Sequence, residues 1–375
     1  MKPRTWMWMP VVSLVAALAI TIPISAQTII TFDAPGAGTG PGQGTFVASI
    51  NPSGAITGVT LDAADKRHGF VRSANGTFTT FDVPGSGTGA FQGTRTLSIN
   101  PAGAVTGWYL DLSWSRRGYV RDEKGNFTSF DAPGASKSGG TWPESINPAG
   151  AIAGFSIDAK NSVFHGFLRS AHPSAWGSII TIDAPGAGTS AYVGTLIFGI
   201  NPAGAVAGEA HDNNNVAHGF LRAPDGTFTT FDAPGAGTDP NEGTLVYGIN
   251  PAGAITGSTI DSSFVFHGYV RAPDGTFTTF DAPGAGTVSY SGQGTTDSSI
   301  NPAGAIVGNA LDASNVYHGF LRDPNGNFTT FDAPGAGNAT DSYLGTFPMA
   351  NNPSGKITGS YTDAGNVLHG FVREP

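Results

Sequence analysis

The residues of this 375-residue chain that could recognise a ligand concentrate in one stretch of its first half. Trp, Tyr and Arg dominate the energetics of binding interfaces, and exposed aromatic rings also stack on sugars. The stretch contains eight candidates for a ligand site: Arg95, Trp108, Tyr109, Trp114, Arg116, Arg117, Trp142 and Glu144. Packing of the Trp rings in gaps between structural units is the alternative interpretation. It explains Trp114 least well, because Trp114 lies in the loop 112–115.

A second group of polar residues breaks the local pattern at Glu209, His211 and Asp212. Glu209 and His211 point to one face if they lie in a strand, where side chains alternate. Such groups could hold a metal ion or exchange protons, whereas a polar substitution at the exposed end of a strand requires no chemistry. Asp297 and Glu144 form no evident carboxylate pair, and no Gly-x-Ser-x-Gly motif stands beside a matching His and acid. The sequence therefore names no catalytic residue and no cofactor.

A third group recurs along the chain, and recurrence indicates a structural role before a chemical one. A His-Gly-Phe/Tyr segment follows a repeated Asp by a few residues, as His68 follows Asp62. This spacing across a short hairpin predicts a His–Asp or His–backbone hydrogen bond at a buried polar site. The Asp of the Phe-Asp-Ala-Pro-Gly segment, such as Asp232, is predicted to make an Asx-type turn.

These residues belong to a unit of about fifty residues that is repeated seven times. The Asp of the Phe-Asp-x-Pro-Gly-like segment and the Asn of the Asn-Pro-Ala/Ser-Gly turn each recur at intervals of 47 to 54 residues. Such a period indicates stacked supersecondary units in a solenoid or a propeller. Each unit has four short runs rich in β-branched and aromatic residues, separated by turn sequences such as Asn-Pro-Ala-Gly and Pro-Asp-Gly. We therefore predict an all-β, seven-bladed β-propeller with four antiparallel strands per blade.

The two ends of the repeated region are complementary. Residues 28–36 resemble the fourth strand of a unit, whereas the chain stops at residue 375 after a third strand. An open stack would need polar caps at its ends, but in a closed ring the first strand completes the last blade. We therefore predict that residues 28–33 pair beside residues 368–373, which also removes an exposed strand edge.

Loop variation is predicted to fall on one face of the ring. If the Phe-Thr-Thr-Phe strand is outermost, the connections between blades and the hairpins between second and third strands share a face. The connections are the variable segments 36–43, 85–92, 134–140, 186–193, 235–242, 284–293 and 335–344. A rigid scaffold with one variable loop face is the usual arrangement of a binding surface.

The N-terminal residues and the composition place the protein outside the cytosol. Residues 1–26 combine a basic start, an apolar run and a small-residue cleavage site at Ile24-Ser25-Ala26, as in a secretory signal peptide. A retained membrane anchor is the alternative, but Pro10 interrupts the apolar run. Without Lys2 and Arg4 the net charge is −11 (16 basic against 27 acidic residues), which argues against nucleic acid and anionic membranes. The chain has no Cys, so no disulfide contributes to its stability. Residues 27–375 are predicted to form a single, monomeric domain.

The pattern Asn-Pro-x-Gly-x-Ile/Val-x-Gly, followed by His-Gly-Phe-Leu/Val-Arg, resembles that of the bacterial extracellular HAF-repeat proteins. The middle Ala of the family's His-Ala-Phe is Gly here, as in His68-Gly69-Phe70, and the second copy departs further with Arg117-Gly118-Tyr119. The resemblance covers the whole mature chain. It implies export and a propeller-like β fold, and it implies no catalytic residues.

Three functions are compatible with these features. A secreted binding or scaffold module would engage a glycan or a protein through the variable loop face, and this is the leading interpretation. An extracellular carbohydrate-active hydrolase or lyase with its site at the channel mouth is the alternative. It would need a convergent set of groups, for which Glu209, His211 and Asp297 are the asymmetric candidates. A structural repeat in cell-surface material would have no small-molecule site.

Overall fold

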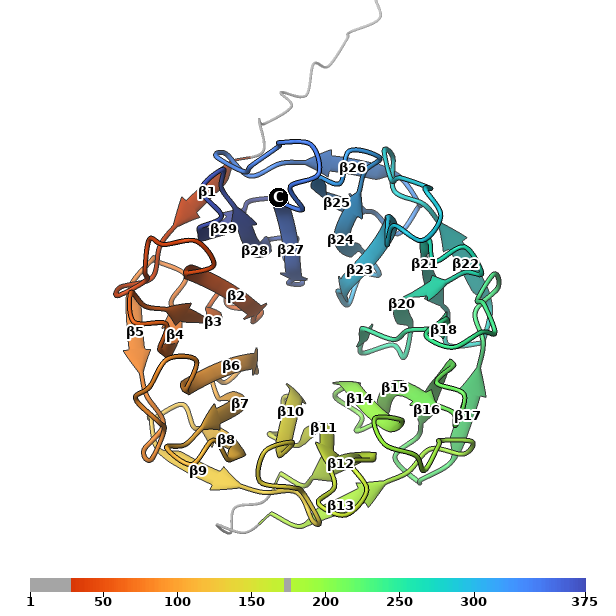
Figure 1. The fold of residues 1–375 in the computed structure, drawn as a ribbon, viewed down its shortest axis with the longest axis horizontal. Coiled ribbons are helices and arrows are strands. Elements are labelled where there is room, and N and C mark those ends of the chain that lie inside the picture. The colour runs from red at the N-terminus through yellow and green to blue at the C-terminus, as the bar shows by residue number, and fades with distance from the viewer. Residues whose placement is uncertain (1–27, 172–176) are drawn as a thin grey trace, which may run out of the picture.

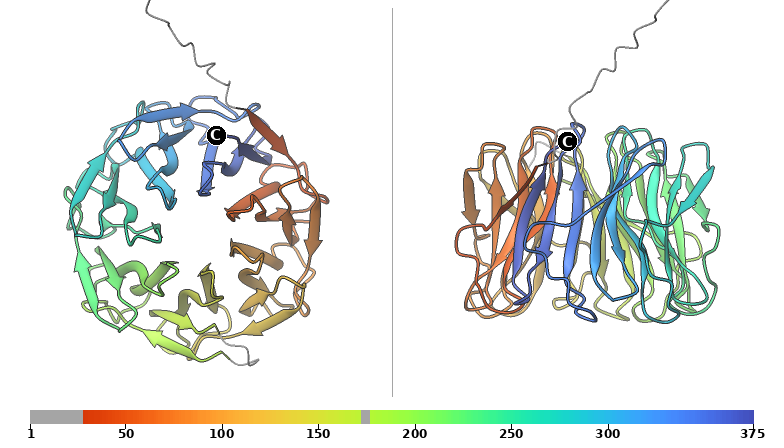
Figure 2. Two further views of the ribbon diagram at one scale, coloured as in Figure 1. Left: turned by 180° about the vertical axis from the view of Figure 1, so that it is seen from behind. Right: turned by 90° about the horizontal axis from the view of Figure 1, so that it is seen from above.

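The protein is a ring of β-strands. The computed structural model describes residues 28–171 and 177–375, within which every regular element is a strand and the strands number 29. They are arranged radially (Figure 1), and the side view shows a thick ring with loops at both ends (Figure 2). Within the described ranges no helix is long and apolar enough to cross a membrane. The predicted signal peptide, residues 1–26, lies outside them.

Antiparallel pairing groups the strands by four, with the first strand of each group nearest the centre and the fourth at the rim (Figure 1). The first three groups are β2 (Gly44–Ile50), β3 (Ile56–Leu61), β4 (Arg67–Arg72) and β5 (Phe78–Phe81); β6 (Gly93–Ile99), β7 (Val105–Leu110), β8 (Arg116–Arg121) and β9 (Phe127–Phe130); and β10 (Thr141–Ile146), β11 (Ile152–Ile157), β12 (Phe164–Arg169) and β13 (Ile179–Ile182).

The remaining strands repeat this arrangement. The next three groups are β14 (Gly194–Ile200), β15 (Val206–His211), β16 (Ala217–Arg222) and β17 (Phe228–Phe231); β18 (Gly243–Thr244) with β19 (Gly248–Ile249), β20 (Ile255–Ile260), β21 (Phe266–Arg271) and β22 (Phe277–Phe280); and β23 (Gly294–Ile300), β24 (Ile306–Leu311), β25 (Tyr317–Arg322) and β26 (Phe328–Phe331). The last group is β27 (Gly345–Asn351), β28 (Ile357–Thr362), β29 (Leu368–Arg373) and, from the other end of the chain, β1 (Ile29–Phe32).

The predicted pairing of the two ends is confirmed. Strand β1 runs antiparallel to β29, with Ile29 opposite Arg373 and Phe32 opposite Gly370. A parallel bridge between Gly44 and Leu368 joins the next group to the same strand. Gly44 has a φ of 120°, and a Cβ at this position would collide with the Leu368 carbonyl group, so the close approach requires glycine. The ring therefore closes through the backbone.

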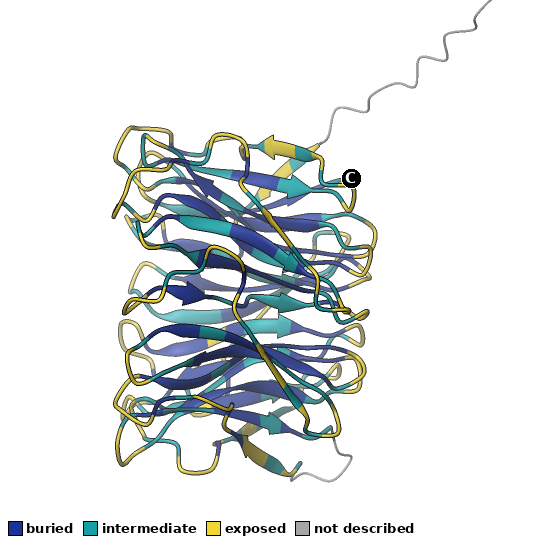
Figure 3. Cartoon of the chain, turned by 90° about the vertical axis from the view of Figure 1, so that its right-hand side faces the viewer, coloured by how far each residue is buried: buried dark blue, intermediate teal, exposed yellow. Residues whose placement is uncertain are grey.

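The core lies between neighbouring groups and stabilises the ring by burying their facing surfaces. Ile56 and Phe70 of one group pack with Val372 of the preceding one, and both Ile56 and Phe70 are fully buried. Buried residues run along the strands, whereas exposed residues gather in the loops and at the rim (Figure 3). Because each sheet has two covered faces, its inner strands are buried on both sides, as in β3 and β7, in which every residue is buried.

The two ends of the ring differ, as the sequence predicts. At one end, the repeated turn asparagines link successive groups, since Asn51 donates its side-chain amide to the Asn100 carbonyl at 3.2 Å and Asn352 donates to the Asn51 carbonyl at 3.3 Å. At the other end, the connections meet the hairpins between second and third strands, as in the bond from the Arg67 amide to the Gln92 carbonyl. We call this second end the loop face.

Candidate functional site

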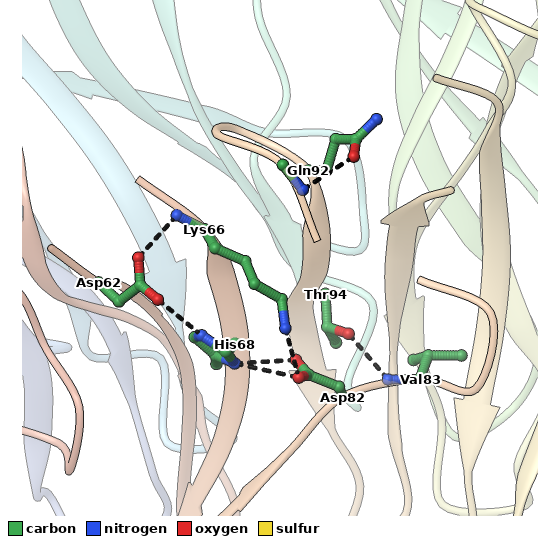
Figure 4. Close-up of polar contacts among 8 residues, drawn as sticks. Asp62, Lys66, His68, Asp82, Val83, Gln92 and Thr94 are labelled. Carbon is green, nitrogen blue, oxygen red and sulfur yellow. Dashed lines mark hydrogen bonds and ion pairs between the residues drawn. The ribbon is translucent and has the colours of Figure 1, made fainter. Parts of the chain in front are cut away.

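The repeated histidines each lie beside a carboxylate, as predicted, but the site is partly exposed and not buried, since the His68 side chain is 27% exposed. His68 Nδ1 lies 3.0 Å from Asp82 Oδ1, and its Nε2 lies 3.2 Å from Asp62 Oδ2 (Figure 4). The Asx-type turn expected at Asp82 does not form, because its carboxylate faces His68 and Lys66. The adjacent turn is held by the Val83 amide, which donates to the Thr94 hydroxyl at 2.9 Å.

The second copy replaces this histidine by Arg117. Its Nη2 lies 2.9 Å from Asp131 Oδ2, and both side chains are about half exposed. The negative charges of Asp131 and of Tyr109 on ionisation raise the pKa of Arg117, with Asp131 contributing most. Arg117 thus performs the structural task of the histidine at the outer part of the group, away from the channel. Tyr109 is buried and packs with Val83 and Tyr119.

Neighbouring groups meet at two tryptophans that hold an arginine. The guanidinium carbon of Arg116 lies 3.9 Å from the centre of the Trp142 ring and 4.7 Å from that of Trp108. The two indoles meet edge to face at 5.4 Å, and Trp142 also stacks on Phe155 at 5.5 Å. Trp142 donates its indole N–H to the Gly139 carbonyl, which also accepts from Arg116 Nη1. The rings therefore serve to position a cation, since aromatic faces attract guanidinium groups.

Two further arginines complete this cluster. The guanidinium carbons of Arg67 and Arg95 lie 5.7 and 5.8 Å from the Trp108 ring. We refer to Arg67, Arg95, Trp108, Arg116 and Trp142 as the arginine–tryptophan cluster. In the part of the chain that the structure describes, Lys66, Arg117 and Lys356 are the lysines and arginines that form ion pairs. The three cluster arginines therefore have no described carboxylate within 4.0 Å.

The unpaired positive charges affect one another. Burial, together with the positive charges of Arg67 and Arg95, lowers the pKa of Arg116 to about 10. Burial also lowers the pKa of Arg95, which the charge of Glu144 partly offsets. The Arg95 side chain is exposed to the space inside the ring. Protein surrounds this space, and the surrounding protein lowers the pKa of Arg95. The cluster is thus a site of concentrated positive potential.

Arg95 and Glu144 line a central cavity of about 620 Å³. The cavity extends to Thr362 and Leu368, which bound a hairpin of the loop face. Burial raises the pKa of Glu144 to about 7, against the positive charge of Arg95, which favours the carboxylate. Glu144 therefore changes charge near neutral pH inside the cavity, beside the cluster.

The structure brings together five of the eight predicted ligand-site residues and separates the other three. Arg95, Trp108, Arg116 and Trp142 belong to the cluster, and Glu144 lines the adjoining cavity. Trp114 is 53% exposed in its hairpin and lies outside the cluster, as do Tyr109 and Arg117. Trp108, at 3% exposure, fits the alternative interpretation, because its ring fills the space between groups.

Arg67 was not among the predicted site residues, although the sequence contains a signal for it. It occupies the first position of the third strand, where later copies have Phe164, Ala217, Phe266, Tyr317 and Leu368. Only the first and second copies carry Arg there, at Arg67 and Arg116. Two further positions can be compared between the second and third copies. Arg95 is equivalent to Trp142, and Trp108 is equivalent to Phe155. Comparison of equivalent positions across copies would therefore have marked Arg67 as a departure from the repeat.

The residues considered for a metal site do not converge. His211 Nε2 lies 3.1 Å from Glu209 Oε1, but Asp212 accepts hydrogen bonds from the amides of its own turn, including that of Val216. Glu209 also accepts the Val246 amide at 3.0 Å and is buried, so it is not a substitution at an exposed strand end. Burial opposes charge on His211, but the hydrogen bond and charge of Glu209 outweigh it and raise the pKa of His211. Among the described residues no group of three or more His, Asp or Glu side chains could hold a metal ion.

Asp297 is an isolated buried carboxyl group. It accepts a hydrogen bond from the Thr256 hydroxyl at 2.6 Å, and its other oxygen is buried without a hydrogen-bond partner. Burial raises its pKa well above the usual range, so the protonated form is favoured. Asp297 and Glu144 both line the cavity. The hydrogen bond that Asp297 accepts from Thr256 suits a structural role.

Known proteins resemble this chain only distantly. No family model and no curated protein matches this sequence. Among solved structures, puromycin hydrolase is similar at 12% identity and a TM-score of 0.49, over 88% of this chain and 50% of the hydrolase. The chain thus spans about half the length of that protein. A subtype N11 neuraminidase-like protein of a flat-faced bat isolate is similar at 10% identity and a TM-score of 0.37, over 92% of both chains.

Proposed function

We propose that this protein is a secreted, monomeric seven-bladed β-propeller that acts as a binding or scaffold module for a glycan or protein ligand. The repeat count and the pairing of β1 with β29 support the architecture. The resemblance to bacterial extracellular HAF-repeat proteins and the signal-like residues 1–26 support export. Recovery of a mature chain that begins at Gln27 from the cell exterior would test export, and retention of residues 1–26 in the cell would contradict it.

The observation that carries the binding function is the set of three unpaired arginines around Trp108. Uncompensated positive charge at a partly enclosed site costs free energy. Structural arginines such as Arg169 and Arg271 also stack on Phe rings without an ion pair, but each stacks singly, whereas the cluster gathers three arginines around one ring. Arg117, one residue beyond Arg116, is paired with Asp131. A cluster that departs from the repeat, adjoins a cavity and gathers three arginines without an ion pair is best explained by a ligand. The ligand site is therefore assigned to the channel mouth formed by β4, β6, β7, β8 and β10.

The binding function is tested with the purified mature chain on a glycan array and against immobilised proteins of its own secretome. We expect the wild-type chain to retain a defined ligand, Arg116→Gln to lose it, and Arg117→Gln to keep it. Arg117 is the matched control, because it is an arginine of the same strand whose charge is already paired. Ligand retention by Arg116→Gln would place the site elsewhere.

The alternative is a carbohydrate-active hydrolase or lyase, and Glu144 is the observation that favours it. A carboxyl group with a pKa of about 7 in a cavity has the property of a general acid. Such a reaction needs a second group, and Asp297 is the other carboxyl on the cavity wall. Incubation with a panel of polysaccharides tests this directly. New chain ends formed by the wild-type protein and not by Glu144→Gln would establish catalysis, whereas unchanged polymer would favour the binding module.

A further inference from the structure

The arginine–tryptophan cluster concentrates three positive charges in a chain whose formal net charge is −9. The guanidinium carbons of Arg67, Arg95 and Arg116 all lie within 5.8 Å of the centre of the Trp108 ring. Cation–π contacts stabilise each cation. They do not remove the repulsion among the cations, which only an anion can relieve.

The cluster arginines also have donors to spare. Arg116 uses Nη1 for the carbonyls of Gly139 and Ser138, and Arg67 uses Nη1 for the Phe91 carbonyl. The side chain of Arg95 makes no hydrogen bond to another described residue and is exposed to the space within the ring. A guanidinium group with free donors matches a carboxylate in geometry and charge.

One exposed aromatic ring lies beside these donors on the loop face, and a second lies in the next hairpin. Phe91 is 49% exposed, and its ring centre lies 5.8 Å from the Arg67 guanidinium carbon. Trp114 is 53% exposed and precedes Arg116 by two residues. Both residues have a positive φ, near 60°, as do their counterparts in other copies, such as Tyr290 and Phe264, so the repeated turns set this conformation. A free ring beside a free guanidinium suits a sugar ring that carries a carboxylate.

We propose that the arginine–tryptophan cluster binds the carboxylate groups of an acidic saccharide, such as a chain of uronic acid residues. The inference rests on the proposed function and specifies its ligand. An acidic polypeptide would offer the same charge but no sugar face for the exposed rings of Phe91 and Trp114, and neutral glycans would leave the arginines unpaired.

The experiment measures binding of the mature chain to three soluble probes by calorimetry: oligogalacturonate, its methyl ester and polyglutamate. We expect oligogalacturonate to bind, with affinity that falls as salt rises, because screening weakens charge attraction. The methyl ester should bind at least about tenfold more weakly, which corresponds to the loss of one charge-assisted contact of about 1.4 kcal/mol. Polyglutamate should also bind at least about tenfold more weakly than oligogalacturonate.

Two variants locate the contact. Arg95→Gln should weaken oligogalacturonate binding by about tenfold or more, because a charge-assisted hydrogen bond to the carboxylate is lost. Arg95 is exposed, so this variant should fold as the wild type does, whereas Arg116→Gln also removes the contacts to the Trp rings. Arg117→Gln should change the affinity by less than about twofold, since Arg117 is paired with Asp131 outside the cluster.

The outcomes distinguish this inference from the function on which it rests. Equal binding of the acid and its ester, or unchanged binding by Arg95→Gln, would overturn the acidic-saccharide inference while leaving a glycan-binding module intact. Tighter binding of polyglutamate would overturn it in favour of an acidic protein partner. Absence of binding to all three probes would also overturn it, and a neutral ligand found on the array would then leave the binding module in place.

Discussion

The guanidinium carbon of Arg116, on β8, lies 3.9 Å from the centre of the Trp142 ring on β10. This contact joins two neighbouring four-stranded groups, and Trp142 stacks on Phe155 within its own group. The half-buried Trp142 ring is thus already engaged by two protein partners, which limits its availability as a surface for stacking on a ligand. Its part in the site is to hold a cation, and the exposed rings nearby remain available for contact.

Replacement of Trp142 by Ala should destabilise the ring. The change removes the stack on Phe155, the contact with Arg116 and the bond to the Gly139 carbonyl. We expect a loss of about 2 kcal/mol, less than the ~3–5 kcal/mol of a fully buried aromatic residue, since Trp142 is half-buried. Trp114→Ala is the control and should change stability by no more than about 0.5 kcal/mol, because Trp114 is exposed. Urea midpoints of the two variants test this, and equal midpoints would contradict it.

Closure by β1 should contribute substantially to stability. A chain that begins at Ala34 loses β1, whose four residues pair with Gly370–Arg373. It also loses Asp33, the partner of His369 at 2.9 Å. With about 1 kcal/mol for each lost hydrogen bond and the loss of buried area, we expect destabilisation of more than about 3 kcal/mol.

A permuted chain provides the control for closure. Moving residues 29–33 to follow Pro375, through the turn Asp-Gly-Thr found at 225–227, restores the missing strand with the connection that the other groups use. We expect this chain to recover most of the thermal midpoint of the wild type. Recovery without the moved strand, or no recovery with it, would show that β1 does not close the ring.

Acid should destabilise the ring through the hairpin carboxylates. Burial alone would raise the pKa of Asp62, but hydrogen bonds from the amides of Lys66 and Ala64 and from His68 outweigh it and lower the pKa below 3.8. The same holds for Asp261 and Asp363. A group with a depressed native pKa stabilises the fold above its unfolded pKa, and this stabilisation is lost as pH falls through the native pKa.

We therefore expect the thermal midpoint to be level near pH 5 and to fall steadily below pH 3.8. Asp62→Asn should lower the midpoint at pH 5 and reduce the difference between pH 5 and pH 2.5, because it removes one titrating group and a hydrogen-bond acceptor for amides. A midpoint that rises on acidification would contradict the linkage. Asp225→Asn, at an exposed turn that bonds Thr227, should have a smaller effect at pH 5.

The ring closure and the loop face were predictable because they follow from local turn chemistry repeated in every copy. Asn-Pro-Ala-Gly and Pro-Asp-Gly fix the hairpins whatever the surrounding residues, and the incomplete units at the two ends leave one arrangement for β1. The cluster was predictable only in part. Tyr109 and Arg117 look like binding residues by type, but the register of β7 and β8 turns them toward the core and toward Asp131.

Side-chain contacts between copies could not be predicted from residue type. Arg67 reaches Trp108 from the preceding group, across a distance in sequence that no motif spans. The sequence is compatible with a polar substitution at an exposed strand end for Glu209, yet Glu209 is buried and accepts the Val246 amide of the next group. Both contacts join neighbouring groups. Repeat spacing predicts which groups are neighbours, but it does not predict which side chains make contact between them.

Glu144 should titrate near neutrality and thereby control ligand affinity. Burial raises its pKa to about 7, and the charge of Arg95 opposes this rise. The other titratable groups on the cavity wall are Tyr247 and Asp297, whose pKa values burial also raises, so both favour the uncharged form. Carbon-detected NMR of the Glu144 carboxyl should show a midpoint near 7, and Arg95→Gln should move it upward because a favourable positive charge is removed.

Deprotonation of Glu144 should weaken the binding of a carboxylate ligand. Deprotonation of Glu144 above pH 7 adds a negative charge beside Arg95, which repels a carboxylate ligand. Oligogalacturonate affinity should therefore fall between pH 6 and pH 8, by about threefold to tenfold at low salt for one added charge in a partly hydrated cavity. Glu144→Gln should bind at pH 8 as the wild type binds at pH 6, with a flat profile over this range. A profile that stays steep in Glu144→Gln would assign the titration to Asp297, and a flat wild-type profile would remove Glu144 from the site.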